Sequence, residues 1–578
     1  RMHGMHGTDF WGFDAGFKNG YAMVGGTYHN GTIIRYNDIY KGGLTDPNTG
    51  GWLAELGGDN YRGFVNYGNQ KVGYHDGGSF NFSEIRSERI TSRSFQSDKK
   101  CNTSYVTGEY GNYGFDPMNY NHFYSPVDSK LFETNNGGVS FTELHDFGGA
   151  KVIQVKVGWT NPNYIYVTHK YSNSVFKIWK SIDKGQNWTE ITPTSSETGN
   201  NQNRVKYIEV DDEDPSKLWC ILMGSQTGNK VFKSIDGGLN WTNITTASIQ
   251  AENVISISHH YGTDDGLYIG TKKRIYYKNN SMADWELFNT DLPASVACNF
   301  IVPYYGEGKI RTATQRGVYQ CDFYEDVAPV ALFAAEATEI NYSANCTEDS
   351  IRFVDHSTVR HNTATWQWFF EGGNPSTSTL ENPVVTYATP GVYDVKLIVT
   401  DAFGIDSIEI ADFITITNAP NSPNIYEEFS GTEFPPNNWK LIDSEGSSWE
   451  KDYPENDLTN GVASYPNYWV NSTNETHLLV TPAVDLTNAL WYSIAWDYTY
   501  HDNNSYKDTL AVLYRTGTNS TWQTIWIKGG ADLRVPATDV WFWYDANPTV
   551  SWNSELIDLS FLVGEDCVEF AFDNRGEN

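Results

Sequence analysis

SIDKGQNW, at residues 181–188, returns as SIDGGLNW at residues 234–241, and this repeat indicates the fold of the first 325 residues. The two copies start 53 residues apart, and a weaker copy, TNNGGVSF at residues 134–141, starts 47 residues before the first. In both strong copies an Asp side chain can bond to the backbone N–H groups ahead of it, and a Gly can adopt the positive φ that follows. The stretch therefore predicts a tight hairpin turn that is closed by an aromatic ring.

Each copy follows a strand-like segment with a turn of its own. The sequences of these turns are DPMN at residues 116–119, NPNY at 161–164 and DPSK at 214–217. The unit is therefore strand, turn, strand, turn, strand, and its regular return along the chain indicates the blades of a β-propeller. Looser units start near Tyr21, Gly57, Asn253 and Ser295, so the count predicts about seven blades within residues 1–325.

The composition agrees with an all-β protein of several domains. A length of 578 residues suggests three or four domains. Aromatic residues make up 15% of the chain, with 20 Trp, 37 Tyr and 29 Phe, whereas a disordered acidic chain would be poor in them. Abundant aromatic residues and Gly, together with short apolar runs, are typical of β-sheets.

The charge balance excludes several classes of partner. Lys and Arg total 40 against 71 for Asp and Glu, which gives a formal net charge of −31. Because binding to phosphates needs Lys and Arg, we expect no nucleic acid partner and no anionic membrane surface. No stretch approaches the ~18 apolar residues of a membrane span, so we expect no membrane insertion. Carboxylates do suit Ca²⁺. The acidic run at residues 211–214 predicts a solvated turn, with a Ca²⁺ loop as the alternative.

The two strong copies resemble the Asp-box, or BNR, repeat of sialidase-like, sortilin-like and xyloglucanase-like β-propellers, because both fit its Ser-x-Asp-x-Gly-x-x-Trp pattern. In that family the box is structural and lies at the blade periphery. The resemblance therefore implies a structural role, and no catalytic role, for Ser181, Asp183, Gly185, Trp188, Ser234, Asp236, Gly238 and Trp241. No Phe-Arg-Ile-Pro motif of a sialidase is present. Xyloglucanase-like inversion needs two carboxyl groups about 6.5–9.5 Å apart, which the sequence alone does not identify.

Residues 327–418 predict a small β-sandwich. Tyr393, Val395, Leu397 and Val399 alternate with more polar residues, which indicates a strand with one apolar face. With WQWFFEGGNP at residues 366–375, this region resembles a PKD domain, an immunoglobulin-like sandwich, in a variant associated with Bacteroidota surface proteins. We expect Trp366 and Trp368 to pack in the core or on a sheet face.

Residues 425–578 follow a short Pro-containing linker and form a third β region. Its motifs, among them FPPNNW at 434–439 and LLVTPAVDL at 478–486, resemble in their order the MAM-like cleaved-adhesin or choice-of-anchor jelly roll of secreted Bacteroidota proteins. The closing strand of that family is missing, so we expect the domain to continue beyond Asn578. The resemblance implies a structural Ca²⁺ with Glu428 and Asp485 as ligands, and exposed strand-end carboxylates are the alternative.

Three further features are candidates for chemistry or binding. Cys298 and Cys321 lie on neighbouring strand-like segments and are candidates for a disulfide, with buried free thiols as the alternative. Ser407 and Thr509 lie in Asp-Ser/Thr-aliphatic triplets, a pattern that Bacteroidota use for O-glycosylation. The aromatic run at residues 541–544 could form a glycan platform, although core and inter-domain packing is the favoured interpretation.

These three regions together resemble a secreted, cell-surface Bacteroidota protein that the type IX secretion machinery exports. The first functional hypothesis is a non-catalytic binding or adhesion protein, whose partner is a protein or glycan at the cell surface. The second is a glycoside hydrolase with a catalytic propeller. The third is a structural subunit of a surface assembly.

Overall fold

The computed structural model describes residues 9–575 with gaps. The gaps are residues 17–19, 21, 28–30, 36–51, 57–62, 69–71, 77–79, 87–88, 95–111, 136, 139–140, 174, 202–203, 225–226, 290–291, 344–349, 420–424, 430–433, 437–438, 444–448, 453–460, 466–476, 489–490, 501–507, 518–519 and 536–550. The aromatic run at 541–544 therefore lies outside the described residues.

The first three blades of the propeller are four-stranded antiparallel sheets. Blade one contains β1 (Phe10–Ala15), β2 (Met23–Thr27), β3 (Gly31–Arg35) and β4 (Trp52–Leu56). Blade two contains β5 (Gly63–Val65), β6 (Val72–Asp76), β7 (Phe80–Arg86) and β8 (Arg89–Ser94). Blade three contains β9 (Gly114–Phe115), β10 (Phe123–Val127), β11 (Lys130–Thr134) and β12 (Thr142–Asp146).

Blades four to six repeat this pattern. Blade four contains β13 (Lys151–Val157), β14 (Ile165–Ser172), β15 (Val175–Ser181) and β16 (Thr189–Glu190). Blade five contains β17 (Val205–Val210), β18 (Leu218–Leu222), β19 (Val231–Ser234) and β20 (Thr242–Asn243). Blade six contains β21 (Val254–His259), β22 (Leu267–Thr271), β23 (Ile275–Lys278) and β24 (Glu286–Leu287). The short helix α1 (Ser195–Thr198) links blades four and five and is capped by Thr194 and Glu197.

Blade seven has three strands in the described part of the chain: β25 (Cys298–Tyr304), β26 (Lys309–Thr314) and β27 (Gly317–Asp322), with the 3₁₀ turn η3 (Tyr305–Glu307) between the first two. The seven blades confirm the count expected from the repeats. The sixth and seventh blades begin one and three residues after the expected Asn253 and Ser295, whereas the first begins at Phe10, 11 residues before Tyr21, and the second at Gly63, six residues after Gly57.

The first strand of each blade is the innermost. Strand β1 contacts β5 and β25, and β17 contacts β13 and β21, so these strands line the centre of the ring. The ring closes by side-chain packing between blades one and seven, because Phe10, Phe13 and Met23 share a core cluster with Ala313 and Val318. The Asn299 side chain also donates a hydrogen bond to the Phe10 carbonyl oxygen at 3.0 Å.

The sandwich that follows has two sheets around one core. One sheet contains β28 (Phe333–Ala335), β30 (Ser350–Asp355), β34 (Val384–Tyr387) and β32 (Gly373–Asn374). The other contains β29 (Glu339–Ser343), β36 (Gly404–Ala419), β35 (Gly391–Asp401), β31 (Thr365–Phe370) and β33 (Thr377–Ser378). Val395, Leu397 and Val399 are buried, as the alternation predicts. Trp368 is fully buried, and its indole stacks on Phe370 with ring centroids 5.6 Å apart.

The C-terminal jelly roll is built on a five-stranded sheet. That sheet contains β37 (Lys440–Asp443), β40 (His477–Val480), β45 (Val568–Arg575), β42 (Thr509–Thr516) and β43 (Gln523–Gly529). Two small sheets pair β38 (Glu450–Asp452) with β39 (Val462–Ser464) and β41 (Ser493–Tyr498) with β44 (Asn553–Asp558). Two 3₁₀ turns, η6 (Gly530–Asp532) and η7 (Ser560–Leu562), complete the described elements.

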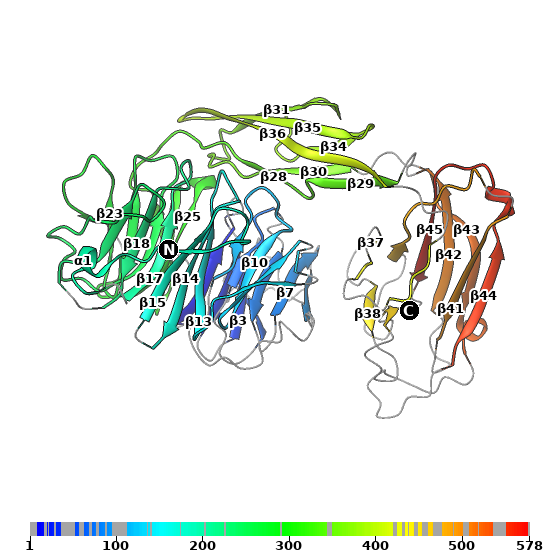
Figure 1. The fold of residues 1–578 in the computed structure, drawn as a ribbon, viewed down its shortest axis with the longest axis horizontal. Coiled ribbons are helices and arrows are strands. Elements are labelled where there is room, and N and C mark those ends of the chain that lie inside the picture. Colours follow the sequence, from blue (N-terminus) through cyan, green and yellow to red (C-terminus); the bar gives the residue numbers. More distant parts are fainter. Residues whose placement is uncertain are drawn as a thin grey trace.

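The sandwich lies along one side of the propeller, and the jelly roll lies at the far end of the molecule (Figure 1). The contact with the propeller is specific: Asn119 forms a parallel β-bridge with Ala335, and the Arg360 guanidinium donates to the Tyr305 carbonyl oxygen at 2.9 Å. Among the described residues no helix is both long and apolar enough to cross a membrane.

Candidate functional site

The two repeated turns adopt the same hydrogen-bonded geometry. In the fourth blade the Ser181 hydroxyl donates to Asp183 at 2.8 Å and accepts from the Gly185 N–H at 2.8 Å. The Asp183 carboxylate also accepts from the backbone and side chain of Asn187 at 2.9 and 2.7 Å. The fifth blade repeats all four bonds within 0.1 Å through Ser234, Asp236, Gly238 and Asn240. These carboxylates are therefore occupied in holding the turn.

The glycines of these turns meet two requirements at once. Gly185 and Gly238 have φ values of +85° and +88°, which favour glycine over residues with a side chain. A Cβ at Gly238 would also lie 2.6 Å from Cδ1 of Ile191, which belongs to the preceding blade. The turn thus combines local strain-free geometry with close packing between blades.

The closing tryptophans differ between the two turns. The half-buried Trp188 donates its indole N–H to the Gly185 carbonyl oxygen of its own turn at 2.9 Å. Trp241 is buried and donates instead to the Ile191 carbonyl oxygen of blade four at 3.0 Å. Trp285, in the looser sixth unit, repeats this inter-blade bond to the Ile244 carbonyl oxygen of blade five at 3.2 Å.

The predicted disulfide between Cys298 and Cys321 is wrong, because neither cysteine is disulfide-bonded. Cys298 pairs with Thr314 and Cys321 with Ile310, on opposite sides of strand β26. Two strand spacings of about 4.8 Å already exceed the ~7 Å limit on Cα separation for a disulfide. Cys567 is disulfide-bonded, which the sequence analysis did not single out.

The other predicted site residues lie apart from one another. Glu428 is exposed and its carboxylate accepts from the Tyr426 hydroxyl, while Asp485 accepts from the Thr487 N–H at 2.9 Å. Ser407 is exposed on strand β36, whereas Thr509 is half-buried between two paired strands. Calcium binding and glycosylation stay predictions.

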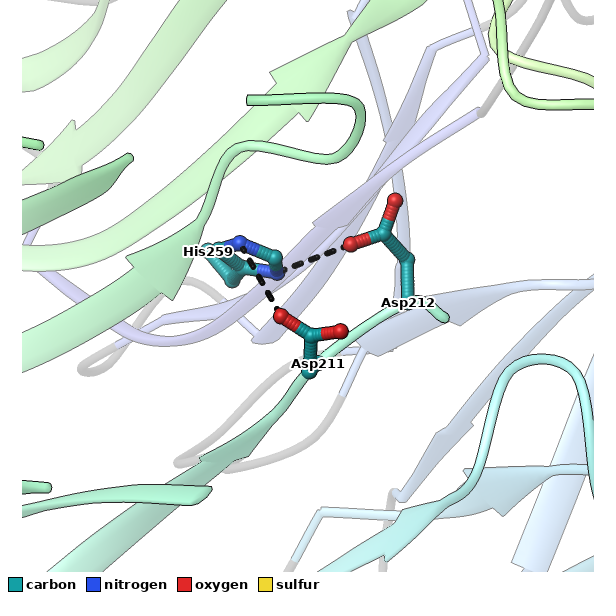
Figure 2. Close-up of side chains that lie close together, drawn as sticks. All are labelled: Asp211, Asp212 and His259. Carbon is teal, nitrogen blue, oxygen red and sulfur yellow. Dashed lines mark ion pairs between the residues drawn. The ribbon is translucent and has the colours of Figure 1, made fainter. Parts of the chain in front are cut away.

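The acidic run at residues 211–214 is not a wholly solvated turn, because Asp211 and Asp212 are both buried. They follow the innermost strand of blade five and approach His259, at the end of the innermost strand of blade six (Figure 2). His259 Nδ1 lies 3.5 Å from Asp212 Oδ1, and His259 Nε2 lies 4.0 Å from Asp211 Oδ2. We call these three residues the acid–histidine cluster.

Charges around this cluster are only partly balanced. The Lys217 ammonium lies 2.7 Å from Asp211 and 3.1 Å from Asp265, and Lys233 also pairs with Asp265. No Lys or Arg of the described residues forms an ion pair with Asp212, whose second oxygen accepts from the Gly262 N–H at 2.9 Å. Burial and the neighbouring Asp211 raise the pKa of Asp212 to about 7. Burial and Lys217 lower the pKa of His259 to about 3, so its imidazole is neutral at neutral pH.

His259 breaks the residue pattern that the three preceding blades share at this position, and the sequence contains this difference. The backbone N–H groups of Asp116, Gly158, Asp211 and His260 each donate to the carbonyl oxygen six residues later, at 3.1, 2.8, 3.0 and 2.8 Å, so these positions are equivalent. The residue before each is Phe115, Val157, Val210 or His259. His259 is thus a polar residue where the three preceding blades carry an apolar one.

The sandwich contacts aromatic side chains that follow the innermost strands of the propeller. Tyr67, Trp159, Tyr261 and Tyr305 follow the innermost strands of four blades, and we call them the aromatic collar. Trp159 and Tyr261 are 5.1 Å apart, and Tyr261 stacks on Tyr305 at 5.9 Å between ring centroids. The imidazole of the sandwich's His356 stacks on Trp159 at 6.4 Å and bonds to the Pro117 carbonyl oxygen at 2.8 Å. The collar is therefore capped by a buried side chain of the next domain.

Known proteins resemble this chain in parts. Over 223 residues it is 22% identical to the xyloglucanase Xgh74A of Acetivibrio thermocellus, a match that covers 35% of this chain and 26% of that protein. The match thus spans about a quarter of the length of that relative.

Among solved structures, the GH74 enzyme of Niastella koreensis is 13% identical, with a TM-score of 0.39 over 97% of this chain and 92% of that one. The extracellular domain of a putative one-component system from B. thetaiotaomicron is 11% identical, with a TM-score of 0.38 over 72% and 57% of the two chains. Residues 327–416 match the family model of the PKD domain, so the sandwich that caps the collar is a PKD domain.

Proposed function

We propose that this chain is a secreted, non-catalytic binding or adhesion protein of the Bacteroidota type, exported by type IX secretion. The observation that carries the proposal is the capped collar. Five described carboxylates lie on or directly after the innermost strands, and all are at most 9% exposed: Asp14, Asp116, Glu209, Asp211 and Asp212. A glycoside hydrolase needs its carboxyl pair on both sides of a sugar that can enter and leave. Buried carboxylates do not meet that need.

The outer rim of the propeller supports a binding role. Ile182 and Ile235 follow the Ser of each strong turn and are 58% and 71% exposed, and Leu239 is 72% exposed. Large aliphatic side chains on a rigid turn suit a protein surface, whereas glycans stack on aromatic rings. We therefore place the contact with a cell-surface partner at this rim and favour a protein over a glycan.

The resemblances of the sequence extend the proposal. The two turns belong to Asp-box blades, and the C-terminal region is a MAM-like jelly roll with a structural Ca²⁺ near Glu428 and Asp485. Ser407, the more exposed of the two glycosylation candidates, would carry the O-linked glycan. One of the similar structures is an extracellular domain, and an extracellular location agrees with the proposed export.

A glycoside hydrolase is the second candidate, and the 223-residue similarity to a xyloglucanase favours it. Its most suitable acid is Glu209, whose carboxylate lies 2.8 Å from the Lys156 ammonium. Burial raises the pKa of Glu209, as a general acid requires. A third role, as a subunit of a surface assembly, would use the same rim.

One experiment separates these functions. The full chain is incubated with xyloglucan, and the released reducing ends are measured. The same chain is applied to a glycan array, and its binding is measured. We expect no release, and the Glu209→Gln variant should behave in the same way. If the wild type released reducing ends from xyloglucan and Glu209→Gln did not, the glycoside hydrolase would replace the proposal. Glycan binding that survives an Ile235→Asp/Leu239→Asp double variant would move the contact away from the rim.

A further inference from the structure

The acid–histidine cluster places one donor atom from each of its three side chains within 4.8 Å of the other two. The donors come from two different blades, and Figure 2 shows the imidazole facing both carboxylates. Within the part of the chain that the structure describes, it is the single group of three or more His, Cys, Asp or Glu residues with this spacing.

His259 gives an independent indication that something is missing from the cluster. Its side chain is fully buried, and neither ring nitrogen has a hydrogen-bond partner. Buried polar atoms nearly always find a partner. At 3.5 and 4.0 Å from the two carboxylates, both nitrogens are too far for a direct hydrogen bond and face acceptor oxygens across a gap.

We propose that Asp211, Asp212 and His259 form a binding site for a divalent transition metal ion of the Zn²⁺ class. At metal–ligand distances of about 2.1 Å, two neighbouring ligands of a tetrahedral ion are ~3.4 Å apart. The 3.5 Å between His259 Nδ1 and Asp212 Oδ1 matches this separation. A bound water would complete four ligands.

The ligand set selects the class of ion. Ca²⁺ takes six to eight oxygens, and Mg²⁺ demands a nearly ideal octahedron of them, whereas the cluster offers two carboxylates and an imidazole. Imidazole suits Zn²⁺, Cu²⁺ and Ni²⁺.

The charge of the cluster favours the same ion. Lys217 is shared between Asp211 and Asp265, and Asp212 has no cationic partner among the described side chains. A buried carboxylate without a cation is costly. A dication held between blades five and six would offset that charge and join the two innermost strands, so its role is structural.

The test uses the full chain after treatment with a chelator. Zn²⁺ is titrated by calorimetry, and Co²⁺ is titrated with visible absorption, because four-coordinate Co²⁺ absorbs intensely. We expect one equivalent to bind and the melting temperature to rise with Zn²⁺. Since the His259 ring lies 4.7 Å from that of Trp219, Cu²⁺ should also quench the fluorescence of this tryptophan.

Variants make the result specific to the cluster. Asp212→Asn preserves size and removes one ligand charge, and His259→Gln removes the nitrogen. Each should weaken Zn²⁺ binding at least 10-fold. His169→Gln is the matched control, because His169 is equally buried in blade four but lies outside the cluster.

The melting temperatures distinguish a lost ligand from a damaged fold. Without metal, Asp212→Asn should melt at or above the wild-type temperature because it removes an unpaired buried charge, and Zn²⁺ should no longer raise it. Zn²⁺ affinity or Co²⁺ absorption that is unchanged in both cluster variants would overturn the proposal, as would the absence of any binding to the wild-type chain.

Discussion

Blade five carries aspartates in two contrasting settings. At its outer edge Asp236 is half-buried, and Asn240 and Ser234 bond to it within the same turn, so that the pKa of its carboxyl is lowered by these bonds. Beside the central strand Asp212 is buried, has one backbone donor and no cation among the described residues, and has a raised pKa. The two side chains are chemically identical and lie 24 positions apart.

The difference teaches where sequence reading succeeds in this fold. Every partner of the Asp236 carboxylate lies within four residues, so its geometry is encoded locally and repeats wherever the motif repeats. The surroundings of Asp212 come from blade six, 47 and 50 residues further along the chain. If local and long-range bonds are divided in this way, removing a bond that crosses blades should cost more than removing one within a turn.

Trp241→Ala should have the largest effect, because this residue closes a local turn but bonds across two blades. Removing a buried Trp costs about 3–5 kcal/mol of the free energy of unfolding. Trp188→Ala, whose indole bonds to its own turn and is half-buried, should cost less. Urea unfolding of both variants measures the difference, and equal losses would show that the inter-blade bond adds nothing.

Arg360→Ala tests the long-range contacts that hold the PKD domain on the propeller. The guanidinium donates to the Tyr305 carbonyl oxygen and pairs with Asp326 at 2.6 Å, and it lies over the Phe323 ring. We expect a loss of about 2–3 kcal/mol and separate melting transitions for the two domains in calorimetry. Arg316→Ala, at an exposed turn of blade seven, is the control and should give a single melting transition in calorimetry, like the wild type.

In blade three the aspartate equivalent to Asp211 has a histidine partner, His122, which can carry a positive charge. Asp116 occupies the position in blade three that Asp211 occupies in blade five, and it bonds to His122 Nδ1 at 2.9 Å. Burial lowers the pKa of His122, but hydrogen bonds to Asp116 and Glu133 outweigh it and raise the pKa from 6.5 to about 8.

Since the folded pKa of His122 is raised, its stabilising contribution is complete below pH 6.5 and disappears as the pH rises through about 8. A rise of about 1.5 pKa units corresponds to about 2 kcal/mol. The wild-type free energy of unfolding should therefore fall by this amount relative to His122→Gln between pH 6 and pH 9. Parallel pH profiles would show that the imidazole is not charged in the folded protein.

Ser234→Ala should have the smallest effect, because it removes only local bonds. The hydroxyl accepts from the buried Gly238 N–H at 2.9 Å and donates to Asp236. Losing it should cost about 1 kcal/mol. If the geometry within the turn determines the loss in free energy of unfolding, Ser181→Ala in blade four should lose the same amount. Clearly different values in chemical denaturation would mean that the neighbouring blades also contribute.

The blade count, the sandwich and its apolar face could be predicted because their signals are periodic. Val395, Leu397 and Val399 alternate with polar residues, and alternation is the physical consequence of a strand with one buried face. The disulfide prediction failed for the opposite reason. Neighbouring segments such as those of Cys298 and Cys321 need not be neighbouring strands once a third strand lies between them.

The candidate metal site could not be predicted as a site. The sequence contains the acidic run that includes Asp211, but a run of charges normally indicates a solvated turn. Its surroundings come from blade six, where the Gly262 N–H bonds to Asp212 and the His259 ring faces both carboxylates. His259 stands at a position that is apolar in the three preceding blades, and this equivalence is visible only from the backbone bonds of the four blades.

The direction of the inter-blade tryptophan bonds bears on how the chain folds as it is made or exported. Trp241 bonds back to blade four and Trp285 back to blade five, so each acceptor precedes its donor in the sequence. A chain that emerges with its N-terminus first always presents the docking carbonyl before the ring that needs it. At these joints the propeller can therefore grow vectorially, each new blade being added to a finished surface, and only the seam between blades one and seven must wait for the last blade.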